Sequence, residues 1–146
     1  MEKEIPKIEN NKVKIYMIQY LALSFIFILL DAIYLTFIQK YFNQQIFLVQ
    51  GDNIKINILG TIFTYIFLVF GLYYFIIREK RNTKDAALLG LVIYAVYELT
   101  NYSILKKWSI YTVLLDTTWG AILFASTTAI FYKLKSINSI RNYINS

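Results

Sequence analysis

Three acidic residues interrupt the most apolar stretches of this sequence. Asp31, Glu98 and Asp116 each have uncharged and mostly apolar neighbours on both sides. A carboxylate inside a hydrophobic segment is costly unless it has a partner, water or a task. The chemistry open to such groups is proton transfer, hydrogen bonding, or binding of a cation through oxygen. What they do therefore depends on how the apolar stretches bring them together.

Hydroxyl, amide and indole groups recur three or four residues from each acid, which is one turn of a helix. Tyr and Trp can donate a hydrogen bond to a carboxylate while their rings stay in apolar surroundings. Glu98 has Tyr94 four residues before it, and Asp116 has Trp119 three residues after it. We therefore predict one polar ligand-binding site inside the membrane. Its predicted members are Asp31, Tyr34, Tyr94, Tyr97, Glu98, Asn101, Asp116 and Trp119.

A divalent cation is one predicted occupant of this site. No Lys or Arg lies close to these acids within the apolar segments that contain them. Three neighbouring carboxylates in a low dielectric cannot all be ionised. A cation held by Asp31, Glu98 and Asp116 would neutralise them, and an all-oxygen ligand set suits Mg²⁺, Ca²⁺ or Mn²⁺. The chain contains no Cys and no His. Thiolate chemistry, Cys/His zinc sites and histidine-based triads are thereby excluded.

The composition indicates an integral membrane protein. The 146 residues are 58% hydrophobic and only 16% charged, below the roughly 25% charged residues of a soluble domain. The charges are clustered, and they leave four apolar runs long enough to cross the roughly 30 Å hydrocarbon core as helices. We predict an all-α, multi-pass four-helix bundle whose surroundings are the lipid bilayer.

The predicted helices cover residues 15–38, 54–77, 84–105 and 109–134, in a membrane domain of residues 15–135. Polar tails are expected at residues 1–14 and 136–146, and residues 39–53 are expected to form a loop or a short interfacial segment. Most Lys and Arg lie in the tails and near residues 78–84, so the positive-inside rule places both termini in the cytoplasm. Topology thus explains the net charge of +6, and nucleic acid is not an expected partner.

Three motifs in these helices resemble a family of small membrane proteins catalogued as domain of unknown function 2177, over about residues 20–133. They are Asp31, Tyr34 and Leu35; Tyr97-Glu98-Leu99-Thr100-Asn101; and Asp116, Trp119 and Gly120. Two positions depart from the family pattern, because Glu98 replaces the usual Asp and Tyr34 stands where Trp is common. The resemblance implies a membrane bundle with a polar site, and it implies no substrate.

Several functions remain open at this point. The site could bind a cation or a small polar ligand, and transport by so small a bundle would require a homo-oligomer, since no Gly- or Pro-broken helix is present. The carboxylates could instead serve an enzyme acting on a lipid or an isoprenoid-like substrate, with a metal as Lewis acid. In a third interpretation the protein is a non-catalytic membrane component, and its polar residues hold helices or partner proteins together.

Overall fold

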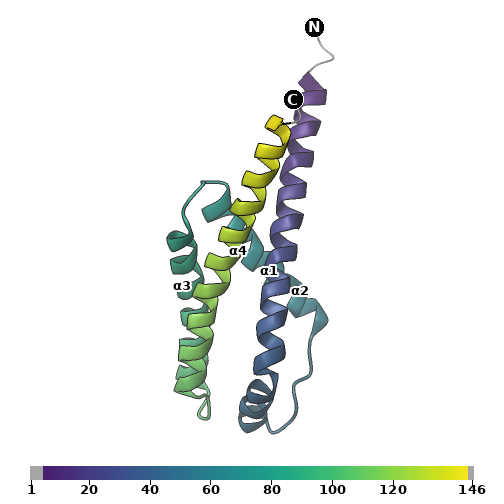
Figure 1. Ribbon diagram of the computed structural model, residues 1–146. Helices are drawn as coiled ribbons and strands as arrows, with labels where there is room; N and C mark the ends of the chain where they lie inside the picture. Colours follow the sequence, from purple (N-terminus) through teal and green to yellow (C-terminus); the bar gives the residue numbers. More distant parts are fainter. Residues whose placement is uncertain (1–4, 145–146) are drawn as a thin grey trace.

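The chain folds into four helices, as predicted, and no strand occurs in the part that the structure describes (Figure 1). The structure is a computed structural model, and it describes residues 5–144, with side chains for residues 13–137. A five-residue π-helical turn, η1, continues the second helix. The elements are α1 (Ile5–Gln50), α2 (Ile58–Leu72), η1 (Tyr73–Ile77), α3 (Thr83–Ile104) and α4 (Ile110–Ile144). α1, α3, α4 and the combination of α2 with η1 each contain a segment long and apolar enough to span a membrane.

α1 is far longer than the predicted helix of residues 15–38. It has 46 residues, about 69 Å at 1.5 Å per residue. It includes residues 39–50 of the region 39–53 that was predicted to form a loop or a short interfacial segment. Residues 39–50 contain no Gly or Pro, and the helix stops only at Gly51, whose φ of 76° is a conformation that favours glycine. The predicted polar tail is helical from Ile5 onward, while residues 1–4 lie outside the described part.

The other boundaries also differ from prediction. α2 begins at Ile58 rather than at residue 54, because the Asn57 side chain caps it by accepting a hydrogen bond from the Gly60 N–H at 3.1 Å. Residues 53–57 therefore have no regular secondary structure, and they run as a stretched connection toward α2 (Figure 1). α3 covers Thr83–Ile104 against the predicted 84–105. α4 continues past residue 134 to Ile144, so the predicted C-terminal tail is helical up to there, and residues 145–146 are outside the described part.

The helices pack unequally. α3 and α4 share the most extensive contact, α1 packs on α4, and α2 rests mainly on α1, so α2 and α3 touch little. α1 begins and α4 ends at the same end of the bundle, and both extend beyond α2 and α3 there (Figure 1). Which side of the membrane this end faces stays a prediction.

Two glycines explain the close approach of α3 and α4. A Cβ built on Gly90 would collide with the Gly120 carbonyl and would lie 2.8 Å from the Phe124 ring, and one built on Gly120 would collide with the Tyr94 ring. Small residues allow the backbones of membrane helices to approach in this way. The crossing fixes the relative rotation of α3 and α4, and with it the direction of Glu98 and Asp116.

Candidate functional site

Asp31 is the acid of α1, and it connects three helices. Its side chain is only 7% exposed. Tyr65 of α2 donates a hydrogen bond to Oδ2 at 2.6 Å, and the Trp119 indole N–H of α4 donates to Oδ1 at 2.9 Å. Both carboxylate oxygens thus accept from donors on neighbouring helices. The group is satisfied by aromatic donors without a counter-ion.

Asp116 is the acid of α4, and it accepts a hydrogen bond from a residue of α1. Tyr34 of α1 donates its hydroxyl to Asp116 Oδ1 at 3.0 Å. The Tyr34 ring also stacks on Trp119, with centroids 4.2 Å apart and planes 8° apart. α1 and α4 are therefore joined by two hydrogen bonds that run in opposite directions and by the ring stack between them.

Glu98 of α3 is completely buried. Its Oε2 accepts a hydrogen bond from the Trp108 indole N–H at 2.7 Å, but Oε1 has no donor in the described part of the chain. The carboxyl group of Asp116 is close enough to Glu98 for the two acids to interact electrostatically. Two ionised carboxylates can only accept, so one proton held between Glu98 and Asp116 would provide the missing donor.

These contacts form one continuous chain, which we call the acid–aromatic chain, across all four helices. Hydrogen bonds or the ring stack make every step except the one from Asp116 to Glu98, where two carboxyl groups are neighbours. Its members, in order, are Tyr65, Asp31, Trp119, Tyr34, Asp116, Glu98 and Trp108. No Lys or Arg forms an ion pair with any of the three acids in the described residues. Two ion pairs, Lys55–Asp52 and Arg78–Glu79, lie at exposed positions away from these acids.

Three of the predicted site residues make no hydrogen bond within this chain. Tyr94 packs its ring against Gly120 and lines the same cavity as Asp31. Tyr97 is 60% exposed and contributes to a different groove. The Asn101 side chain is partly buried and forms no hydrogen bond in the described structure.

Two donors were missed by sequence reasoning. Tyr65 lies on the second helix, which contains no acid, although Thr61 and Thr64 beside it add hydroxyl groups to that segment. Trp108 lies between two predicted helices, and the α3–α4 turn folds its indole inward, where it is only 7% exposed. The inward orientation of the Trp108 indole could not be inferred from its position in the sequence.

The predicted three-carboxylate metal site does not assemble in this geometry. No group of three or more acidic side chains in the described residues lies close enough to hold a metal ion. Asp31 and Asp116 are bridged instead by the stacked rings of Trp119 and Tyr34. Each of these acids is thereby occupied by a donor of its own.

A cavity opens beside Asp31, on the side where α2 and α3 touch little. Its volume is about 390 Å³. It offers a carboxylate, an amide and several hydroxyl groups, and no Lys or Arg. The lining residues are Asp31, Asn57, Gly60, Thr61, Thr64, Tyr65, Leu68 and Tyr94.

The fold and the site define a multi-pass membrane protein with four helices and a polar network in its interior. The chain belongs to the family described as predicted membrane protein (DUF2177), whose family model matches residues 16–133. The match covers every member of the acid–aromatic chain and agrees with the resemblance of the three motifs. No curated protein and no solved structure matches the chain significantly.

Proposed function

We propose that this protein binds a small ligand with a cationic or hydrogen-bond-donating group inside the membrane, with Asp31 as the principal acceptor. The observation that supports this most is the position of Asp31 in the wall of the polar cavity, without a basic partner. A carboxylate that only connects helices by hydrogen bonds does not require a polar cavity beside it.

The lining determines the kind of ligand. The other polar groups that line the cavity are hydroxyls and one amide, which would complete the coordination of a cation or of a protonated amine through oxygen. No positive charge competes in the cavity. A single carboxylate with neutral oxygens is a weaker metal site than three carboxylates, so Mg²⁺, Ca²⁺, Mn²⁺ and a small organic ammonium ion are all candidates.

Thermal unfolding of the detergent-purified protein tests this proposal. The probes are Mg²⁺, Ca²⁺, Mn²⁺ and methylammonium, each titrated into wild type, Asp31→Asn and the matched control Asp85→Asn, which changes an acid outside the cavity. At least one probe should raise the unfolding temperature of wild type and of Asp85→Asn, but not of Asp31→Asn. An equal rise in all three proteins would reject Asp31 as the acceptor.

A structural role is the second candidate, and the acid–aromatic chain favours it. Each of the three acids is hydrogen-bonded to a residue outside its own helix. In that case the triple variant of Asp31→Asn, Glu98→Gln and Asp116→Asn loses stability, and no probe stabilises wild type. Transport of a ligand would require a homo-oligomer, which cross-linking in native membranes would detect.

A further inference from the structure

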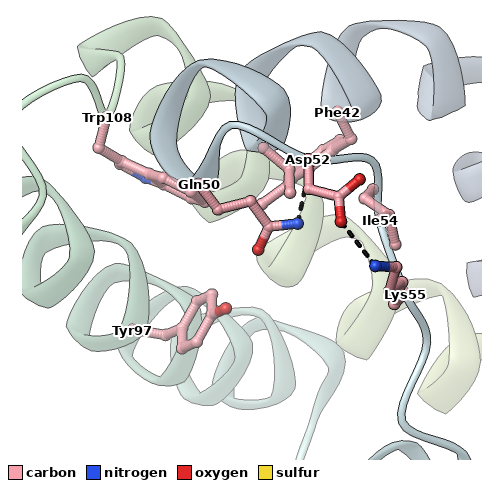
Figure 2. Close-up of a pocket in the computed structure, with 8 residues that line it drawn as sticks. Phe42, Gln50, Asp52, Ile54, Lys55, Tyr97 and Trp108 are labelled. Atoms are coloured by element: carbon pink, nitrogen blue, oxygen red, sulfur yellow. Dashed lines mark hydrogen bonds and ion pairs between the residues drawn. The ribbon is translucent and has the colours of Figure 1, made fainter.

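The last turns of α1 lie at the end of the bundle opposite the start of this helix (Figure 1), and residues there line a second hollow. It is a groove of about 520 Å³ between the last turns of α1, the extended segment that follows, and α3. Its rim is polar and its walls are apolar and aromatic, as Figure 2 shows. The lining residues are Phe42, Ile46, Gln50, Asp52, Ile54, Lys55, Tyr97 and Trp108.

The length of the second span places this groove in the headgroup layer. α2 and η1 together cover 20 residues, Ile58–Ile77, or about 30 Å, which matches the hydrocarbon core. Residues 51–57 therefore lie beyond the hydrocarbon boundary. Their conformation agrees, because residues 54–56 have no regular secondary structure and are exposed. Their backbone N–H groups have no protein acceptor in the described structure. Such backbone is not tolerated in contact with lipid tails.

The rim carries one charge of each sign. Lys55 Nζ lies 2.6 Å from Asp52 Oδ2, with the two side chains 82% and 57% exposed. The Lys55 ammonium, and to a smaller extent the Asn53 backbone N–H, hold the pKa of Asp52 below its usual range. Asp52 is thus ionised at neutral pH, and the rim is a zwitterion with no net charge.

We propose that this groove binds one phospholipid whose zwitterionic headgroup ends in a primary amine. The lipid phosphate accepts from Lys55 and from the free N–H groups of the extended segment, and the lipid ammonium donates to Asp52. The glycerol region and the first methylenes lie against Phe42 and Ile46. A neutral rim with paired charges complements a zwitterion better than it complements an anionic headgroup.

Tyr97 supports this assignment. Its ring is 60% exposed and lines the groove (Figure 2), and its hydroxyl has no partner in the described residues. Exposed aromatic residues with a free polar tip are typical of the headgroup level. The buried Trp108 forms the opposite wall and connects the groove to Glu98 through its indole N–H.

The test is binding of short-chain phosphatidylethanolamine, phosphatidylcholine and phosphatidylglycerol to the purified protein, measured by native mass spectrometry. Wild type should prefer the ethanolamine lipid, because choline lacks an N–H donor and glycerol lacks the positive charge. Asp52→Asn should lose that preference. Lys55→Gln should bind about fivefold more weakly, equivalent to about 1 kcal/mol, whereas the control Lys106→Gln should bind as wild type does.

Three results would overturn the proposal. The first is equal binding of the three lipids. The second is equally strong binding of glycerophosphoethanolamine, which has no acyl chains and would show that the apolar walls contribute nothing. The third is a concentration-dependent dimer that Asp52→Asn disrupts, because the groove would then be covered by a second copy of the chain. Asp31→Asn should retain lipid selectivity. A failure of the lipid-groove proposal is therefore distinguishable from a failure of the proposed ligand site at Asp31.

Discussion

Tyr34 and Trp119 stack face to face, and each ring donates to the acid on the other ring's helix. Tyr34 of α1 bonds Asp116 of α4, and Trp119 of α4 bonds Asp31 of α1. Two acids that would be costly alone in a membrane are thereby turned into the contact that joins α1 to α4. The two hydrogen bonds and the ring stack all require the same relative position of α1 and α4 along their axes.

Replacing Trp119 by Phe should test the donor without removing the stack. The indole N–H is lost, Asp31 keeps only its bond from Tyr65, and a buried acceptor is left partly unsatisfied. We expect the free energy of unfolding in mixed micelles to fall by about 1–3 kcal/mol. Denaturant titration followed by circular dichroism would measure this change.

The matched control is the same substitution in an Asp31→Asn background. An Asn side chain is neutral and accepts a weaker hydrogen bond than a carboxylate, so Trp119→Phe should lower the free energy of unfolding clearly less in this background. The double-mutant cycle should therefore give a coupling energy different from zero. If the two substitutions are simply additive, the hydrogen bond between Trp119 and Asp31 contributes nothing to stability.

The glycine crossing gives a second prediction. Gly90→Ala or Gly120→Ala places a methyl group where backbone or ring atoms already lie, and we expect a loss of about 1–3 kcal/mol from overpacking. Gly71→Ala is the control, because a Cβ there has nothing within 4 Å. It should be neutral or stabilise the helix by up to about 1 kcal/mol. Similar losses in all three variants would contradict the close crossing of α3 and α4.

Hydropathy was sufficient to predict four helices, but not their ends. Each apolar run satisfies the length requirement of a bilayer by itself, so its existence does not depend on tertiary contacts. The end of α1 does depend on them. Residues 39–50 are polar enough to form a loop, yet Gln45 is buried, where it donates to the Lys107 carbonyl and lies 3.3 Å from the Thr112 hydroxyl. A partner 62 residues away cannot be inferred from local composition.

The site was predictable to a similar extent. Spacing correctly indicated that Asp31, Glu98 and Asp116 lie near aromatic donors, because neighbours one turn apart are a local property. It paired each acid with donors on its own helix, whereas every donor observed comes from elsewhere in the fold. The rotation of each helix decides this, and it follows from packing such as the Gly90–Gly120 crossing. The expected metal site failed to assemble for the same reason.

The ion pair at the groove should respond to acid. The folded pKa of Asp52 is depressed by Lys55, so whatever the pair contributes is present above the ordinary pKa of Asp and is lost as the pH falls through the lower, folded value. Carbon-detected NMR of the labelled side chain should give a midpoint below that of a free Asp. In Lys55→Gln the midpoint should return toward the ordinary value, and high salt should have the same effect. An unchanged titration midpoint of Asp52 in Lys55→Gln would show that Lys55 and Asp52 do not form an ion pair in solution.

The last prediction concerns the proton between Glu98 and Asp116. Glu98 Oε1 is buried without a donor, and the only hydrogen that the neighbouring carboxyl group of Asp116 can offer is an acidic proton. Infrared difference spectra between H₂O and D₂O should therefore contain the carbonyl stretch of one protonated carboxylic acid at neutral pH. Glu98→Gln should remove that band, since the amide N–H₂ then donates to Asp116 in its place, and Glu79→Gln should leave it intact. Absence of the band in wild type would mean that both acids are ionised, and an unseen cation or water would then have to satisfy Glu98.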